Sequence, residues 1–172
     1  MFGKAVILLF VTSLAIAGPS TIYTNEVGEG WVDSISNNGV AAGANSGANQ
    51  YFMWTPDTGN QFIGGVSPGN NVGGQAGVSD DGAFICGSML NIMTENYEAG
   101  LYNVQTETWT ALGGIGGSSG NSVSSGWGIS GDGSRIVGLA WEDAGTAYAT
   151  TWSVFGVPTS LGSSVSGSST RA

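Results

Sequence analysis

Three stretches of the chain carry the same order of polar and apolar positions. In each, a β-branched residue is followed by Ser, any residue, Asn or Asp, and Gly, and then by a small apolar run that closes on another Gly. The stretches are residues 35–43, 78–87 and 129–138. Asn-Gly or Asp-Gly between two apolar runs is a strong hairpin signal, because Gly adopts a positive φ without steric cost. The pattern therefore predicts a β-hairpin at each of these turns.

Each predicted hairpin is followed by two further strands. The third strand is predicted over residues 50–55, 100–104 and 148–154, and each copy carries an aromatic residue at an equivalent place, Trp54, Tyr102 or Trp152. A polar turn then leads to a short closing strand, predicted over residues 61–65, 110–114 and 159–162. Because the three aromatic side chains recur at one position, we expect them to lie in the core.

The recurring unit is typical of a β-propeller blade, which has four strands in roughly fifty residues. The predicted fold is therefore all-β, with three four-stranded antiparallel propeller-type blades. Their approximate bounds are residues 30–65, 74–114 and 125–162. No segment after the N-terminal leader has a 3.6-residue apolar period, so we expect almost no helix. A β-solenoid is the alternative, but the repeat is longer than typical solenoid coils.

Three blades are fewer than a closed propeller needs, since propellers usually have about 4–8. Residues 163–172 parallel the approach to another hairpin, which indicates either the start of a further repeat or a tail. We expect either that the sequence is a fragment of a longer protein, which we favour, or that another subunit covers the open edges. Uncovered edge strands pair readily with partners, so self-association through open sheet edges is also expected.

The N-terminal residues have the order of a secretory signal. Lys4 precedes a short apolar run, and Ala15-Ile16-Ala17 supplies the small residues that a signal peptidase requires. The run is shorter than the roughly 20 apolar residues that span a bilayer. We therefore expect residues 1–17 to be a cleaved signal peptide, residues 18–172 to be a single β-repeat domain, and the protein to be extracellular or periplasmic, with no membrane contact after cleavage.

Charge and composition narrow the expected chemistry. The formal net charge is −9, which disfavours binding to nucleic-acid phosphates. The chain contains no His, which excludes Ser–His and Cys–His nucleophile pairs and imidazole metal sites. Cys86 is the only cysteine and lies in an apolar run, so we expect a buried thiol and no intramolecular disulfide. We expect no metal and no cofactor.

The repeats resemble those of the HAF family of extracellular proteins. The shared pattern is the Ile-Ser-x-Asx-Gly hairpin, the aromatic third strand and the closing Leu-Gly, and it covers about residues 31–162. The chain departs from the family at the His-Ala-Phe triplet, where it has Gln50-Tyr51-Phe52, Ala99-Gly100-Leu101 and Ala147-Tyr148-Ala149. The resemblance implies a divergent, secreted, propeller-like protein of unsettled function and supplies no catalytic residues.

Two groups of residues are candidates for binding. Four tryptophans vary in position between the copies, and an exposed indole face stacks on sugar rings; they are Trp31, Trp109, Trp127 and Trp141. The alternative for each is a ring packed between blades. Residues 89–98 and 142–146 are predicted inserts between second and third strands, where binding specificity often lies. They contribute the acidic candidates Glu98, Glu142 and Asp143.

Two functions fit these observations. The first is a secreted, non-enzymatic binding or surface-scaffold module whose partner is a protein or a glycan. The second is a glycan-active, glycosidase- or sialidase-like propeller enzyme whose active site lies partly on missing blades. Glycosidases need two carboxyls facing each other across a cleft, and the pairs Asp80-Asp81 and Glu142-Asp143 are neighbours in predicted turns and loops. We therefore favour the binding module.

Overall fold

The computed structural model describes residues 30–69 and 72–162. The expected signal peptide and the expected start of a further repeat lie outside the described residues. Every regular element in the described part is a β-strand, which confirms the all-β prediction. Accordingly, a search of the described residues finds no helix of the length and apolarity needed to cross a bilayer.

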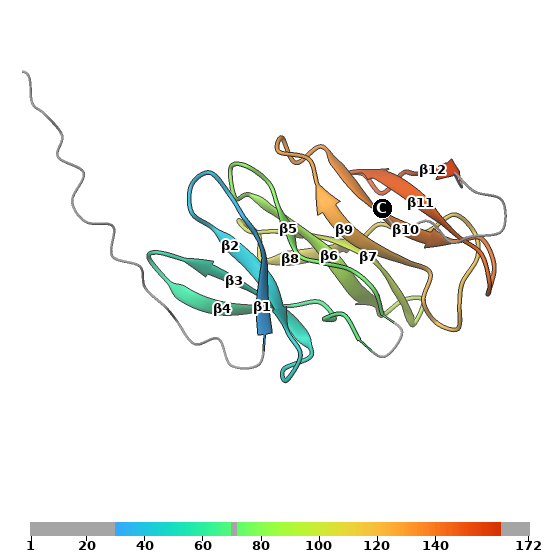
Figure 1. The fold of residues 1–172 in the computed structure, drawn as a ribbon, viewed down its shortest axis with the longest axis horizontal. Coiled ribbons are helices and arrows are strands. Elements are labelled where there is room, and N and C mark those ends of the chain that lie inside the picture. The colour runs from blue at the N-terminus through green and yellow to red at the C-terminus, as the bar shows by residue number, and fades with distance from the viewer. Residues whose placement is uncertain (1–29, 70–71, 163–172) are drawn as a thin grey trace, which may run out of the picture.

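The strands form three antiparallel four-stranded sheets, each with its strands in chain order (Figure 1). Blade 1 comprises β1 (Gly30–Ile35), β2 (Ala41–Asn45), β3 (Gln50–Thr55) and β4 (Gly59–Gly64). Blade 2 comprises β5 (Gly77–Val78), β6 (Phe84–Asn91), β7 (Asn96–Asn103) and β8 (Thr108–Ala111). Blade 3 comprises β9 (Ser124–Ile129), β10 (Arg135–Trp141), β11 (Ala147–Ser153) and β12 (Pro158–Gly162). These are the predicted propeller-type blades.

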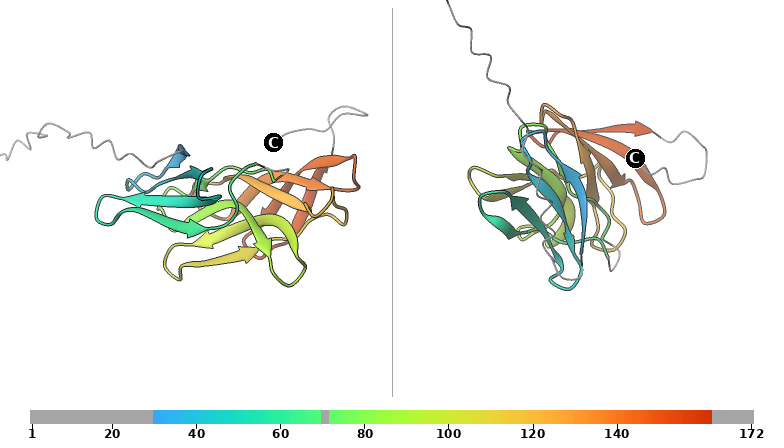
Figure 2. Two further views of the ribbon diagram at one scale, coloured as in Figure 1. Left: turned by 90° about the horizontal axis from the view of Figure 1, so that it is seen from below. Right: turned by 60° about the vertical axis from the view of Figure 1, so that its left-hand side comes forward.

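Blade 2 lies between blades 1 and 3, and the first strand of each blade faces the same side (Figure 2). β5 contacts both β1 and β9, so these three short strands are the inner strands of the arrangement. The fourth strands, β4, β8 and β12, are the outer edges of their sheets. Blades 1 and 3 both contact blade 2, so within the described residues each of these two blades has one face without a neighbouring blade.

The first turn of each blade is built in the same way. In blades 2 and 3 the Ser79 and Ser130 hydroxyls donate to the carboxylates of Asp81 and Asp132, and each serine oxygen accepts a backbone N–H five residues later. Blade 1 repeats this with an Asn, in a turn shorter by one residue. The glycine that follows has φ of 89°, 69° or 72° in the three copies, which explains why Gly recurs there.

The three turns are linked to one another by the backbone. The Asn37 N–H donates to the Asp80 carbonyl at 2.9 Å, and the Asp80 N–H donates to the Gly131 carbonyl at 2.8 Å. These residues occupy the same place, one after the turn serine, in blades 1, 2 and 3. Blades 1 and 2 thus each donate one backbone hydrogen bond to the equivalent residue of the next blade.

The core consists of two layers of side chains, one at each junction between blades. At the first junction Tyr51 of blade 1 packs against Gly87, and its hydroxyl accepts the Ser88 N–H at 3.1 Å. At the second junction Trp152 and Ile136 of blade 3 pack with Cys86 and other residues of blade 2. Tyr102 and Trp152 are buried, as predicted for the recurring aromatic residue.

Two predictions require correction. Trp54, the blade 1 counterpart of Tyr102 and Trp152, is only partly buried, because no blade of the described structure packs on its side of blade 1. Residues 89–98 are mostly strand rather than an inserted loop: β6 and β7 continue as one long hairpin, with Leu90 paired to Tyr97, and only residues 92–95 form the turn. The other predicted insert, residues 142–146, is a loop between β10 and β11.

Candidate ligand-binding groove

A groove of about 170 Å³ lies where the three inner strands meet. Asp33 and Ser34 line it from β1, Gly77 and Val78 from β5, and Trp127 and Gly128 from β9. Drug-sized ligands occupy pockets of roughly 300–1,000 Å³, so this groove has room for one small ring or side chain of a larger ligand. All three blades contribute to it.

Backbone bulges place the one charged and the one aromatic side chain among the described residues that line the groove, Asp33 and Trp127. In β1 the pairing with β2 passes from Val32 to Ser34 and skips Asp33, and in β9 the pairing with β10 skips Trp127 in the same way. Both residues stand three positions before their turn serine, so they are equivalent in the repeat. A bulge re-aims the side chain of the extra residue. Asp33 and Trp127 are thereby directed to the groove instead of following the ordinary alternation of the strand.

Asp33 is a half-buried carboxylate with fixed partners. Its Oδ2 accepts the Ala76 N–H from blade 2 at 3.0 Å, and the side chain of Trp31 donates a second hydrogen bond to it. Burial nevertheless raises the pKa of Asp33 above 3.8, since desolvation outweighs these two hydrogen bonds. The neighbouring Ser34 Oγ accepts the Val78 N–H at 3.3 Å. The carboxylate is therefore held in one orientation and keeps acceptor capacity toward the groove.

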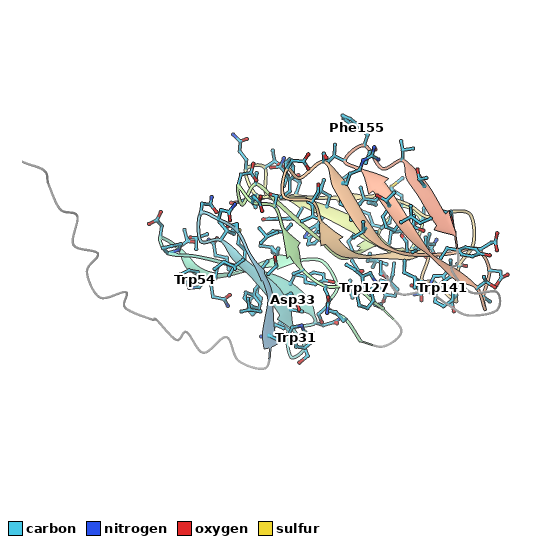
Figure 3. All side chains as sticks on the ribbon, turned by 45° about the horizontal axis from the view of Figure 1, so that its top comes forward. Trp31, Asp33, Trp54, Trp127, Trp141 and Phe155 are labelled. Atoms are coloured by element: carbon cyan, nitrogen blue, oxygen red, sulfur yellow. The ribbon has the colours of Figure 1, made fainter. Side chains whose placement is uncertain are left out.

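Trp127 is a half-buried ring on the other side of the groove (Figure 3). Its indole N–H donates to Ser125 Oγ at 2.8 Å, and the backbone at Gly73 lies directly against the ring. The floor between the Trp127 and Asp33 side chains is glycine backbone. A Cβ at Gly77 would lie 2.9 Å from Cys86 Sγ and 3.1 Å from the Gly128 Cα, so the close approach of β5 and β9 requires glycine here.

The other tryptophan candidates have different surroundings. Trp31 is 42% exposed on β1 beside Asp33, at the rim of the groove. Trp109 lies between the rings of Tyr51 and Tyr102, with centroids 5.8 and 5.4 Å away, and its indole N–H donates to the Ile63 carbonyl of blade 1 at 2.6 Å. Trp109 thus joins blades 1 and 2. Trp141 is half-buried at the end of β10, apart from the groove residues.

The acidic candidates separate into one buried and two exposed residues. Glu98 is 5% exposed, and its two carboxylate oxygens accept hydrogen bonds from Asn91, Thr94 and the Gly113 N–H. These bonds hold the β6–β7 hairpin against the strand that follows. Glu142 and Asp143 are exposed in the β10–β11 loop.

The exposed carboxylates Glu142 and Asp143 both make hydrogen bonds to nearby groups. Asp143 Oδ1 accepts the Gly145 N–H at 2.8 Å, which lowers the pKa of Asp143. A hydrogen bond with the Glu142 carboxylate, together with its charge, raises the pKa of the Tyr148 phenol. The structure therefore brings together Trp31 and Trp127 of the predicted residues around Asp33, and it leaves Trp109, Trp141, Glu98, Glu142 and Asp143 elsewhere.

Asp33 was not identified from the sequence, although a signal for it exists. The three equivalent positions, three before each turn serine, hold Asp33, Ala76 and Trp127, whereas the turn itself is nearly constant. The residue at this position differs between the three repeats, whereas the turn that follows it hardly changes. This variation indicates that the side chain at this position is not needed for the fold that the repeats share.

Comparisons with known proteins add no assignment. A scan against protein-family models finds no match to this chain, and a search of curated proteins likewise finds none. Within residues 30–69 and 72–162, no three His, Cys, Asp or Glu side chains gather as a metal-binding group.

Proposed function

We propose that this chain is a secreted, non-enzymatic, propeller-like binding module whose inner groove takes one sugar unit of a glycan. The observation that carries the proposal is the pair of equivalent bulges that direct the Asp33 carboxylate and the Trp127 ring to one groove. A carboxylate accepts strong hydrogen bonds from sugar hydroxyls, and an indole face packs against the apolar face of a sugar ring.

The charge of the groove selects among glycans. Asp33 is the only ionisable side chain among the described residues that line it, and the protein carries a net charge of −9. Sugars that carry carboxylate, sulfate or phosphate are repelled by such a site. The expected ligand is therefore a neutral glycan.

A glycosidase-like enzyme remains the second candidate from the sequence, but the groove favours it less. Hydrolysis by the usual mechanisms needs two carboxyls about 5–10 Å apart, and the groove lining supplies one. Release of sugar by the wild-type protein that is abolished in Asp33→Asn would contradict the binding proposal and support the enzyme.

We also propose that the repeats are of the HAF type and that residues 1–17 act as a cleaved signal peptide. The threefold Ser-x-Asx-Gly turn supports the first proposal, and the order of charge, apolar run and Ala-x-Ala supports the second. An exported protein whose intact mass begins at Gly18 is the expected result, and retention of residues 1–17 would refute the signal peptide.

The groove is tested by binding of the full chain to a neutral glycan array, followed by calorimetric titration of the best ligand. Asp33→Asn removes the charge at constant size and is expected to weaken binding roughly tenfold, the usual loss for a charged hydrogen bond. Trp127→Ala is expected to weaken it by at least as much, and Trp127→Phe by less. Because the pKa of Asp33 is raised, wild-type affinity should fall with acidification at a pH above the usual aspartate range.

The controls remove equivalent groups elsewhere. Asp57→Asn neutralises an exposed carboxylate in the β3–β4 turn, and Trp141→Ala removes a tryptophan outside the groove. Both should leave affinity unchanged. Loss of binding in Trp141→Ala together with unchanged binding in Asp33→Asn would move the site to the β10–β11 loop.

A further inference from the structure

Both junctions between blades join the same two kinds of surface. The trailing face of a blade, which turns toward the next blade, is represented in blade 2 by Cys86, Leu101 and Leu112, and these pack on blade 3. The leading face, which turns toward the preceding blade, is represented in blade 2 by Ile85, Tyr102 and Val78, and these pack on blade 1. A trailing face therefore always packs on a leading face.

No blade in the described part of the chain covers the trailing face of blade 3. Strand pairing makes Val137 and Thr151 the counterparts of Cys86 and Leu101. Leu161 corresponds to Leu112 because each stands two residues after the threonine that pairs with that third-strand residue. Val137 is 39% and Leu161 62% exposed, whereas Cys86 is 0% and Leu112 2% exposed. Blade 3 thus exposes Val137 and Leu161, beside Thr151 and Arg135, at positions whose blade 2 counterparts are packed against the next blade.

The leading face of blade 1 likewise has no covering blade within residues 30–69 and 72–162. Ile35 is 68% exposed, whereas its blade 2 counterpart Val78 is 7% exposed. Trp54 is partly exposed, and Figure 3 places it at the end of the molecule away from blade 3. Val32 and Phe62, also exposed, extend the apolar area on this blade.

The backbone linkage between the turns is also open at both ends. In the series Asn37 to Asp80 to Gly131, each N–H donates to the carbonyl of the next blade. Within the described part of the chain, the Gly131 N–H has no such acceptor and the Asn37 carbonyl has no such donor. A trailing face of blade 3 packed on a leading face of blade 1 would supply the missing pair.

Charge does not oppose such packing. The described carboxylates lie in turns and loops, in the groove, or, for Glu98, inside blade 2. Among the described strand residues of blades 1 and 3, the charged side chains are Asp33, which lies in the groove, and the exposed Arg135, which the strand register places on the same face as Val137. The positive charge of Arg135 is opposite in sign to the net charge of −9 that the chain carries. Electrostatic repulsion between acidic surfaces therefore disfavours association of two copies through the rest of the surface, and it does not act between these two faces.

We propose that a second copy of this chain packs head to tail on the first, with each blade 3 on the partner's blade 1, so that two copies close one six-bladed ring. Propellers have about 4–8 blades, and six is the only multiple of three in that range. Two identical head-to-tail contacts related by a twofold axis close the ring and leave no open face. This places self-association on the blade faces rather than on the sheet edges expected from the sequence, and it does not depend on the proposed function.

The test is the mass of the full chain in solution, measured by light scattering and native mass spectrometry. The expected wild-type result is a dimer, with twice the mass of the chain. Ile35→Asp changes the leading face and Leu161→Asp the trailing face, and each is expected to weaken dimerisation at least a hundredfold. Both side chains are mostly exposed in the single chain, so each variant should fold, which far-UV circular dichroism checks.

A mixing experiment separates a head-to-tail contact from a self-symmetric one. When the two variants are combined, one of the two contacts in the mixed pair joins unmodified faces, so mixed dimers are expected where neither variant dimerises alone. Ile92→Asp is the matched control, because Ile92 is 82% exposed in the β6–β7 turn, away from both faces, and it should leave the dimer intact. A wild-type monomer at hundreds of micromolar, a dimer that survives both substitutions, or a longer native polypeptide that is monomeric would overturn the proposal.

Discussion

At the scale of single residues, Tyr51 shows how one side chain connects two blades. Its ring is fully buried against the backbone of Gly87, where a Cβ would lie 2.7 Å from the ring, and against Gly65 and Gly74. Its hydroxyl accepts the Ser88 N–H, and burial raises the pKa of the phenol. The ring of Tyr51 therefore occupies space that a side chain at these glycine positions would fill.

Tyr51→Phe is expected to lower the free energy of unfolding by about 1–3 kcal/mol, because it leaves the buried Ser88 N–H without its acceptor. Urea unfolding followed by tryptophan fluorescence measures the change. Tyr148→Phe removes a hydroxyl at the protein surface and should leave stability nearly unchanged. Equal stability of Tyr51→Phe and wild type would show that water or another group satisfies Ser88.

At the scale of the element, the first turn of each blade serves two purposes. It reverses the chain through the Ser–Asx hydrogen bond and the glycine with positive φ, and it contacts the turn of the next blade. At Gly82, a Cβ would lie 2.7 Å from Val40 Cγ2 and 2.8 Å from Asn38 Oδ1 in blade 1. Glycine is thus required there for conformation and for packing.

Comparison of Gly82→Ala with Gly59→Ala separates these two requirements. Both glycines have φ near 69°, but a Cβ at Gly59 would meet nothing within 4 Å. We expect Gly59→Ala to cost about 1–2 kcal/mol through backbone strain alone. We expect Gly82→Ala to cost at least ~1 kcal/mol more through overpacking. If denaturant unfolding shows that both variants lose the same free energy of unfolding, the turn of blade 1 moves to accept the Cβ at no cost in stability.

At the scale of the whole molecule, acidic side chains in the turns make stability depend on pH. Hydrogen bonds from Ser130 and Ser134 lower the pKa of Asp132 from 3.8 to about 2. The Ala83 N–H and Ser79 lower the pKa of Asp81, and the Gly145 N–H lowers that of Asp143. Burial acts in the opposite direction on Asp33. The described carboxylates with lowered pKa outnumber the one with raised pKa.

A carboxylate whose pKa is lower in the folded state stabilises the fold fully above its unfolded pKa, and this stabilisation is lost as pH falls through the folded pKa. For Asp132 the loss falls between about pH 4 and pH 2. The urea midpoint is therefore expected to decrease over this interval. Asp132→Asn should flatten the decrease without changing its position, and a midpoint that is constant from pH 4 to pH 2 would contradict the assignment.

Predicted and observed strands agree best where a strand is determined by residues close to it in the sequence. Residues 50–55 are the third strand both in the prediction and in the structure. In blade 2 the predicted strand began at Gly100, but β7 begins at Asn96, because Glu98 and Tyr97 pair with residues on β6 that follow the hairpin signal. Trp54 has the sequence signature of a core residue, yet whether it is covered depends on a neighbouring blade that no local pattern describes.

Only part of the candidate site could be predicted from the sequence. Trp31 and Trp127 stood out because they vary between otherwise similar copies. Asp33 did not stand out. The alternation of side chains along a strand predicts which face each residue lies on, but it does not show where a bulge shifts the pairing, as it does at Asp33. The skipped pairings at Asp33 and Trp127 arise from how each inner strand meets its neighbour and the next blade.

Local sequence patterns are sufficient to predict the three Ser-x-Asx-Gly turns, the four strands of each repeat and the division into three blades. These follow from contacts within a few residues and from the alternation of apolar side chains, which are written directly in the chain. Local patterns do not predict which strands are innermost, that Asp33 and Trp127 share a groove, or that blades 1 and 3 keep exposed apolar side chains. These features arise from contacts between different blades, such as those of Asp33 with Ala76 and of Tyr51 with Ser88, which are 43 and 37 positions apart, and the packing of one blade on the next selects the arrangement.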